Sequence, residues 1–240
     1  MTFRTYKNIS RLFLHASGLL LALNLQAMPM VYSGVDSAFA TTESDAAFLQ
    51  WSNSVGDFTL DNLDGLTGSP GIGGSLTSNK GNKFTSTDDM LGMQNFSFAV
   101  LEGTSLQMTK STSANSDNVT SFTWDMIEAV DAFGFYARGN DGGVVTVALN
   151  DGSSQSFSLI AASSNSRGDN LFWGVSNLSS AVQSVKITST DPVTANSNTN
   201  NSNWDRFVYS RAVEVSEPTS LALLLVGLMG IMFSRRQSQA

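Results

Sequence analysis

The sequence contains no cysteine, and its single histidine, His15, lies in an amino-terminal segment that we expect to be removed. The exported chain would therefore have no disulfide bonds, and it would lack the usual general base, the usual nucleophile pair and the commonest zinc ligands. These absences exclude Ser-His-Asp hydrolases, cysteine peptidases and His-bound metal enzymes. Carboxylate chemistry of the glycosidase type, a serine-lysine arrangement or no catalysis remain. We expect a protein that is not an enzyme.

Basic residues are also few, with 13 Lys and Arg against 20 Asp and Glu, which gives a net charge of -7. Five of the basic residues lie near the two ends, so residues 41–215 hold 18 acidic and 8 basic side chains, a net charge of -10. Such an acidic surface repels the phosphates of nucleic acids, so nucleic acid is not an expected partner. An acidic surface can instead bind divalent cations, or it can simply keep the protein soluble.

The amino terminus has the pattern of a secretory signal peptide. Three basic residues lie within the first eleven positions, and an apolar run follows over residues 12–25. Cleavage can be placed after Ala27, at the usual distance from the apolar run, or after Ala40, where Ala38-Phe39-Ala40 gives a better small-x-small site. We expect cleavage after Ala40, which makes residues 1–40 the signal peptide.

The carboxyl terminus carries a second apolar segment, residues 221–233, which contains no charged side chain. As a helix rising about 1.5 Å per residue it would cover only part of a hydrocarbon core about 30 Å thick. The basic pair Arg235-Arg236 follows directly and tends to stay on the cytoplasmic face. The sequence therefore predicts a short transmembrane helix with the preceding chain outside.

The dipeptide Glu217-Pro218, the short apolar helix and the terminal arginines together resemble the PEP-CTERM sorting signal of bacterial proteins handled by exosortase. That family usually has a further proline before the dipeptide, where this chain has Ser216. The resemblance assigns residues 216–240 to a sorting signal. It implies a Gram-negative exporter of exopolysaccharide, an inner-membrane intermediate held by the helix, and an exosortase-type membrane peptidase that removes or exchanges the tail. Delivery to the cell surface or extracellular matrix would follow. An ordinary carboxyl-terminal membrane anchor is the alternative.

Between the two ends, the sequence predicts one short helix and then strands. Residues 44–52 favour a helix with Ser44 as its N-cap and with Phe48 and Trp51 on one face. The apolar period then changes to two over residues 55–61, which predicts a strand.

Later strands are short, aromatic and separated by turn residues. Expected strands cover 95–100, 121–127 and 132–137, and residues 144–159 predict a β-hairpin around Asn150-Asp151-Gly152. Val185 and Ile187, and then Phe207 and Tyr209, supply closing strands. The fold class is mainly β, an antiparallel sandwich over residues 41–215. Spacing over about 46–209 resembles the surface domain common in PEP-CTERM proteins, which implies a jelly-roll-like sandwich akin to carbohydrate-binding modules.

Acidic residues near the first and last strands suggest a calcium site formed by Asp57, Asp61 and Asp205, since calcium needs about six to eight oxygen ligands. The alternative is that each of these residues is a solvated strand end or turn residue, for which Asp is chemically suited. For sugar binding, the candidate platform is Trp204, which follows a polar loop, whereas Trp124 and Trp173 have the pattern of core residues.

Three functions fit these observations. The first is an exported, non-catalytic surface or matrix protein associated with exopolysaccharide or biofilm, and it is the one that we expect. The second is a carbohydrate-binding β-sandwich module with structural calcium. The third is a carboxylate glycosidase using a pair such as Asp125 and Glu128, whose carboxyl groups would have to lie about 5 to 10 Å apart across a cleft.

Overall fold

The computed structural model describes residues 28–37, 40–63, 66, 68, 71–86, 90–98, 101–109, 119–138, 142–161, 169–190 and 201–212. All of them lie in one unit, Met28–Ala212. The predicted signal peptide up to residue 27, the predicted tail helix and the sorting motif fall outside the described residues. Among the residues that are described, no helix has the length and apolar character needed to cross a bilayer.

The described part of the chain contains one helix and thirteen strands, all of the strand pairs being antiparallel. In chain order they are β1 (Met30–Asp36), α2 (Thr42–Val55), β2 (Thr59–Asp61), β3 (Gly71–Ile72), β4 (Ser75–Thr77), β5 (Lys83–Ser86), β6 (Met90–Phe98), β7 (Leu101–Thr109), β8 (Val119–Arg138), β9 (Gly143–Leu149), β10 (Ser154–Leu159), β11 (Asn170–Ser176), β12 (Val182–Thr190) and β13 (Asn201–Arg211).

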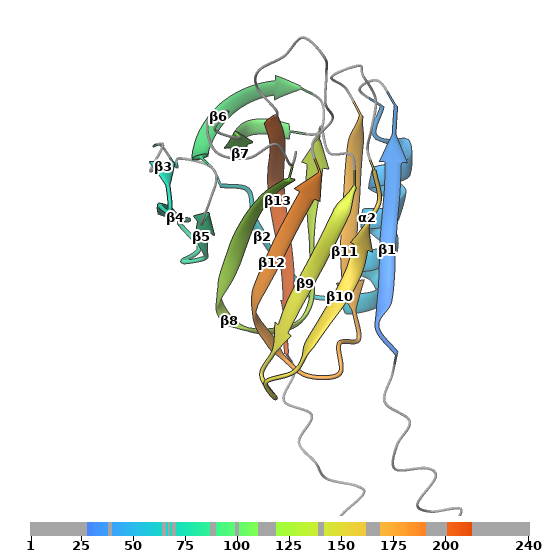
Figure 1. Ribbon diagram of the computed structural model, residues 1–240. Helices are drawn as coiled ribbons and strands as arrows, with labels where there is room; N and C mark the ends of the chain where they lie inside the picture. The colour runs from blue at the N-terminus through green and yellow to red at the C-terminus, as the bar shows by residue number, and fades with distance from the viewer. Residues whose placement is uncertain are drawn as a thin grey trace, which may run out of the picture. The chain divides into compact units, whose positions relative to one another are not determined.

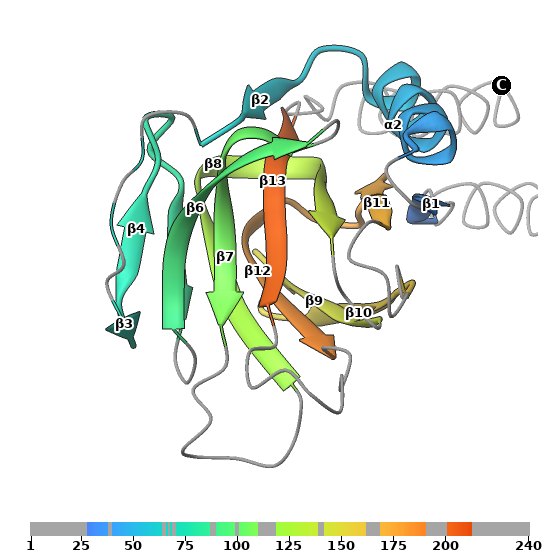
Figure 2. The same ribbon diagram turned by 90° about the horizontal axis from the view of Figure 1, so that it is seen from above.

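The long strand β8 belongs to two packed layers. Its first half pairs with β12 and β5, which makes one layer in the order β4-β5-β8-β12-β9-β10. Its second half pairs with β11 and β13, which makes the other layer, β1-β11-β8-β13-β7-β6-β3, with β2 also on β13. We call these the hairpin layer and the helix layer (Figures 1 and 2). The prediction of a mainly β, antiparallel fold is confirmed, and the two layers are one curled sheet.

The main core lies between the layers and is rich in aromatic rings. Trp124 of the hairpin layer contacts Phe133 at 5.8 Å between ring centroids, and Trp173 of the helix layer stacks on Phe135 at 5.5 Å. Trp124 and Trp173 are fully buried, as predicted. Their rings, together with the alternating Val145 and Val147 of β9 and their neighbours, hold the layers together by removing apolar area from water.

The predicted hairpin is confirmed as β9 and β10, with Ala148 opposite Ser154 at the turn. Gly152 takes the left-handed conformation, with φ 84°, and its amide donates to the carbonyl of Leu149 at 3.0 Å. The Asp151 carboxylate accepts from the amide and the hydroxyl of Ser153 at 2.8 and 2.6 Å. The turn residues that suggested the hairpin therefore form it.

Helix α2 covers the outer face of the helix layer. Its Trp51 is buried among Phe172 and Val208 of a second apolar cluster, and the indole nitrogen of Trp51 donates to the carbonyl of Val175 at 3.1 Å. Phe48 stacks on Trp51 at 6.3 Å, which confirms that these two rings share a face. The helix is longer than predicted, because it continues to Val55. Of the expected strand 55–61, only the last three residues form a strand, which is β2.

The predicted N-cap role of Ser44 is wrong. The helix begins at Thr42, and the carboxylate of Asp36 in β1 accepts from the amides of Glu43 and Ser44, both at 2.8 Å. The Ser44 hydroxyl also donates to Asp36, at 2.6 Å. A carboxylate from the preceding strand thus satisfies the free amides of the first turn, where its charge is also favoured by the helix dipole.

The first and last strands of the chain, β1 and β13, both belong to the helix layer, and the start of one lies near the end of the other. Val31 pairs with Val175, Val175 with Phe133, and Phe133 with Tyr209, so these residues form one row across β1, β11, β8 and β13. The start of β1 and the end of β13 therefore lie at the same end of the layer.

Candidate functional site

A pocket of about 390 Å³ opens between α2, β2 and the outer face of the helix layer. It combines aromatic, apolar, amide and charged groups. The residues that line it are Asp45, Phe48, Leu60, Asn62, Tyr136, Arg206 and Val208.

The polar centre of the pocket is the contact between Tyr136 of β8 and Asp45 in the first turn of α2. The Tyr136 hydroxyl donates to the Asp45 carboxylate at 3.1 Å. Burial raises the pKa of Tyr136 well above its ordinary value, and the charge and hydrogen bond of Asp45 raise it further, against a lowering effect of Arg206. Tyr136 is therefore a neutral phenol at physiological pH and acts as a hydrogen-bond donor, not as a base.

A β-bulge in β13 brings Arg206 to the wall of this pocket. Asp205 pairs with Tyr136 and Val208 pairs with Gly134, so two residues of β13 oppose one residue of β8. Arg206 has a left-handed backbone with φ 47°, uncommon for a residue with a side chain. Its amide donates to its neighbour's carboxylate, the Oδ1 of Asp205, at 2.6 Å, and its guanidinium carbon lies 5.6 Å from the centroid of the Tyr136 ring.

Apolar side chains form the rim. Phe48 contacts Tyr136 at 6.0 Å and meets Phe58 edge-on at 5.6 Å. Phe58 is 39% exposed and Leu60 is 43% exposed, so both present apolar surface to solvent beside the pocket. Aromatic faces next to a carboxylate, an amide and a guanidinium can hold a polar ring compound, by stacking or apolar contact on one side and hydrogen bonds on the other.

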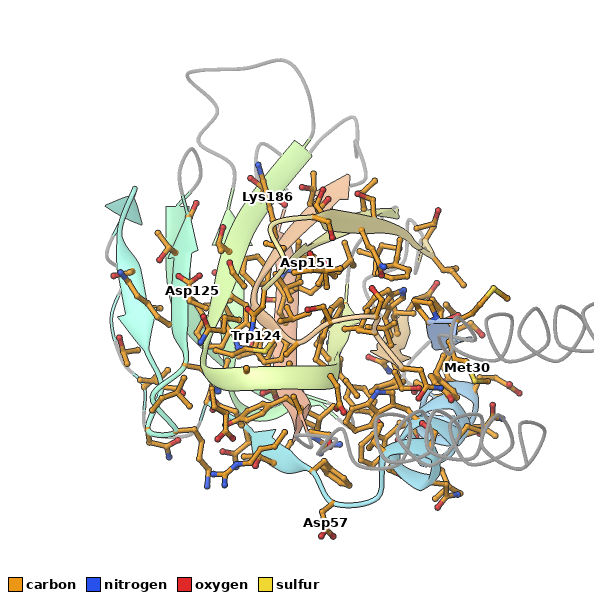
Figure 3. All side chains as sticks on the ribbon, turned by 90° about the horizontal axis from the view of Figure 1, so that it is seen from below. Met30, Asp57, Trp124, Asp125, Asp151 and Lys186 are labelled. Atoms are coloured by element: carbon orange, nitrogen blue, oxygen red, sulfur yellow. The ribbon has the colours of Figure 1, made fainter. Side chains whose placement is uncertain are left out.

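The predicted calcium ligands do not come together. Asp57 is exposed after the end of α2 and points away from the layers (Figure 3). Asp61 lies opposite Phe207, on the core face of the helix layer. Asp205 lies opposite Tyr136, on the face covered by α2. Because cross-strand partners share a face, Asp61 and Asp205 lie on opposite sides of the sheet.

Asp61 has an evident structural role instead. Its buried carboxylate accepts from the Ser78 hydroxyl, from the Asn82 side-chain amide at 2.7 Å and from the Leu63 amide at 3.3 Å. These bonds connect the turn between β4 and β5 to the end of β2. Among the residues that the structure describes, no group of three or more acidic, His or Cys side chains is placed to hold a metal. Calcium binding stays a prediction from the sequence.

The predicted exposure of Trp204 is wrong. Trp204 is fully buried in the main core, 5.4 Å from Phe122 and 5.3 Å from Phe135. The reason is its pairing with Ala137, which points both side chains to the core face. The chain is already a regular strand from Asn201 onward, although the sequence before Trp204 is polar.

The candidate glycosidase pair is not assembled in this pocket, which contains neither Asp125 nor Glu128. Glu128 forms an ion pair with Arg211, with 2.7 Å between the guanidinium nitrogen and the carboxylate. Asp125 lies on β8 opposite Lys83 and Ser184. Within the described part of the chain, Asp45 is the one acidic residue that lines the pocket.

The sequence reasoning missed Asp45, Tyr136 and Arg206 as site residues. One signal was available, because the apolar residues Trp204, Phe207 and Tyr209 break a strict period of two. Such a break predicts a bulge between the first two of them, and bulges re-aim side chains near functional sites.

Comparison with known proteins gives one match in sequence, in which residues 214–236 match the model of the PEP-CTERM protein-sorting motif. The resemblance drawn from Glu217-Pro218, the apolar segment and the arginine pair is thereby confirmed. The motif marks the chain as an exported protein sorted by exosortase through a membrane-anchored intermediate. No curated protein matches the sequence.

Several solved structures show a distant likeness. A variant of a family 29 carbohydrate-binding module aligns with a TM-score of 0.39 at 7% identity, over 68% of this chain and 99% of its own. A family 29 module from Piromyces equi aligns with a TM-score of 0.37 at 12% identity, over 67% and 94%. The cleaved adhesin domain of Lys-gingipain aligns with a TM-score of 0.37 at 8% identity, over 65% and 98%.

Proposed function

We propose that the described unit is a non-catalytic surface or matrix module of a Gram-negative bacterium. A jelly-roll-like sandwich is delivered to the cell surface by exosortase-type processing of the tail and associates there with exopolysaccharide or biofilm matrix. The observation that carries this proposal is the PEP-CTERM motif at residues 214–236.

Two features of the chemistry support a role without catalysis. The chain outside the expected signal peptide has no His and no Cys. Among the residues that the structure describes, the pocket has a single carboxylate, that of Asp45, which accepts from the Tyr136 hydroxyl. Glycoside hydrolysis ordinarily needs two carboxyl groups across the scissile bond. The described lining of the pocket therefore supports binding of a ligand and not its cleavage.

A sugar-binding module is the second candidate, and the pocket favours it. Phe48 and Tyr136 offer aromatic surface, while Asn62 and Arg206 offer hydrogen-bonding groups beside the Asp45 carboxylate. Saccharides present apolar faces formed by their C–H groups and a rim of hydroxyl groups, and such a mixed lining matches both. We place the ligand at this pocket and not at the buried Trp204.

The test is affinity electrophoresis of the purified exported protein through gels that contain the producer's own exopolysaccharide. Retardation of the wild type is expected. The variant Arg206→Gly should bind about tenfold more weakly, which corresponds to about 1.4 kcal/mol, because glycine keeps the left-handed backbone while the guanidinium is lost. Arg211→Ala is the matched control, since Arg211 is an exposed arginine on the same strand outside the pocket.

Each outcome separates the two candidates. Retardation that Arg206→Gly weakens and Arg211→Ala does not supports sugar binding at the pocket. No retardation of the wild type contradicts sugar binding, and cell fractionation then tests the surface role alone. Recovery of the protein only from the cytoplasm would contradict the surface role.

A further inference from the structure

Strand β1 is an integral part of the folded unit, although it lies within the segment expected to be removed with the signal peptide. All seven of its residues pair with β11, from Met30 opposite Ser176 to Asp36 opposite Asn170. Gly34 leaves no room for a side chain, since a Cβ there would collide with the backbone of Glu43 in α2. Strand and helix therefore pack in direct backbone contact.

Asp36 adds a polar connection to this packing. Its buried carboxylate is the acceptor for two amides and one hydroxyl at the start of α2, from Glu43 and Ser44. Without residues 28–40 those amides would lose the carboxylate that caps them, and loss of a helix cap costs about 0.5 to 2 kcal/mol.

Loss of β1 would also expose one side of β11. That strand has the sequence Asn-Leu-Phe-Trp-Gly-Val-Ser, and all seven of its residues are buried. With β1 gone, β11 would become an apolar edge strand with a free row of backbone groups, which invites pairing with other chains.

The Ala40–Thr41 bond, the expected cleavage site, lies inside this folded arrangement. The Ala40 carbonyl accepts from the Asn170 side chain at 2.9 Å, and the Thr41 carbonyl accepts from the Asp45 amide at 2.8 Å as the first bond of α2. A cut between them would separate β1 from the helix that its Asp36 caps.

We propose that signal peptidase hydrolyses the Ala27–Met28 bond and that the mature protein begins at Met28. The hydroxyl of a water molecule adds to the Ala27 carbonyl carbon as the C–N bond breaks, and the amine of Met28 takes the proton and becomes the new amino terminus. Ala27 is a small residue just after the apolar run 12–25, at the distance from that run where signal peptides are cut, although Leu25 stands where a second small residue is usual. The cut leaves β1 whole, with two residues before it.

The direct test is expression of the full chain in a Gram-negative host that exports it, followed by amino-terminal sequencing and intact mass of the exported form. A start at Met28 is expected. A start at Thr41, or an uncut start at Met1, overturns the proposal.

Two matched variants test the site itself. Ala27→Leu places a larger residue before the proposed scissile bond, so the uncut precursor should accumulate. Ala40→Leu makes the same change at an exposed position of the turn, and processing should match the wild type. Accumulation of precursor with Ala40→Leu and normal processing with Ala27→Leu overturns the proposal.

A stability measurement gives an independent readout. Asp36→Asn removes the charge that caps α2, and it should lower the melting temperature of the exported protein by about 4 °C or more. Asp57→Asn, at an exposed aspartate, should leave that temperature unchanged. A mature protein that began at Thr41 would not contain Asp36, so an unchanged melting temperature for Asp36→Asn counts against retention of β1.

Discussion

The guanidinium of Arg206 lies over the ring of Tyr136, with 5.6 Å between its carbon and the ring centroid. Arg206 comes from a bulge in β13 and Tyr136 from the second half of β8, so the contact depends on the pairing of these strands. It places a cation beside the hydroxyl that donates to Asp45.

The Tyr136 hydroxyl should contribute to stability in a pH-dependent way. Its pKa is raised above the ordinary value, first by burial and then by Asp45, so the folded state holds this proton more tightly than the unfolded state. The free energy of unfolding should therefore fall as the pH rises above about 10, where the unfolded tyrosine ionises. Urea unfolding at pH 8 and at pH 10.5 measures this decrease in the free energy of unfolding.

Tyr136→Phe keeps the ring under Arg206 and removes the hydroxyl. It should cost about 1 kcal/mol at pH 8 and should make the alkaline decline shallower. Part of the decline should persist, because the pKa of Tyr209 is raised as well, mainly by burial. An unchanged decline in Tyr136→Phe would show that the hydroxyl is not buried as described.

Asp36 should make the protein sensitive to acid. Burial alone raises the pKa of this carboxyl, but hydrogen bonds from Ser44, Glu43 and Thr42 outweigh burial and lower it. Because the pKa is lowered, the stabilisation of the fold by the ionised Asp36 is complete above the ordinary pKa of an aspartate and is lost as the pH falls below about 4. Thermal melts from pH 6 to pH 3 should show a steeper loss for the wild type than for Asp36→Asn. Parallel curves would contradict the capping role.

Gly152 should be the most sensitive position of the hairpin turn. A Cβ at this residue would meet no atom within 4 Å, so any cost of Gly152→Val comes from the left-handed backbone alone, about 1 to 2 kcal/mol. Ser154→Val, two residues later at an exposed strand position, should be neutral. Chemical denaturation of both variants compares them, and equal stabilities would argue against this turn geometry.

Calcium should not stabilise the protein through Asp57, Asp61 and Asp205, since the sheet separates the last two. Melting temperatures in calcium and in chelator are expected to agree. Saturation at a hundredfold above the dissociation constant would add about 2.7 kcal/mol, which is readily seen. A shift that Asp61→Asn abolishes would restore the site predicted from the sequence.

The tail variants separate processing from orientation. Glu217→Ala with Pro218→Ala should leave membrane insertion intact and block processing, so an uncut form accumulates in the inner membrane. Arg235→Glu with Arg236→Glu should instead disturb orientation and retention. Mass spectrometry of the surface-delivered protein is decisive, because an intact terminus through Ala240 would identify a permanent anchor.

The sequence predicted what depends on short periods and turn residues. The β9–β10 hairpin follows from alternation around Asp151-Gly152, and the shared face of Phe48 and Trp51 follows from helical spacing. The expected strands 121–127 and 132–137 left residues 128–131, Glu-Ala-Val-Asp, as a gap between them. In the structure β8 continues through it, because this is where the strand passes from one layer to the other, with Val130 buried and Glu128 bound to Arg211.

Contacts between distant segments could not be predicted in this way. Tyr136 and Asp45 are 91 residues apart, and nothing local in either segment indicates the other. The pairing of β13 with β8 also decides that Trp204, opposite Ala137, faces the core, although a polar segment precedes it. The candidate site was missed because its residues come from segments far apart in the chain. The expected strands overlap β2, β6, β8, β9, β10, β12 and β13, whereas β1, β3, β4, β5, β7 and β11 were not predicted.

The shared row of Val31, Val175, Phe133 and Tyr209 has a consequence for chain connectivity. Neighbouring strands lie about 4.8 Å apart, so β1 and β13 are separated by about 14 Å at the end where the unit both begins and finishes. A linker of about six residues spans that distance, since each extended residue covers about 3.3 Å. The unit is therefore a good substrate for circular permutation, with Arg211 joined to Met30 and new termini opened at Gly152, because this rearrangement would keep every strand pair of both layers.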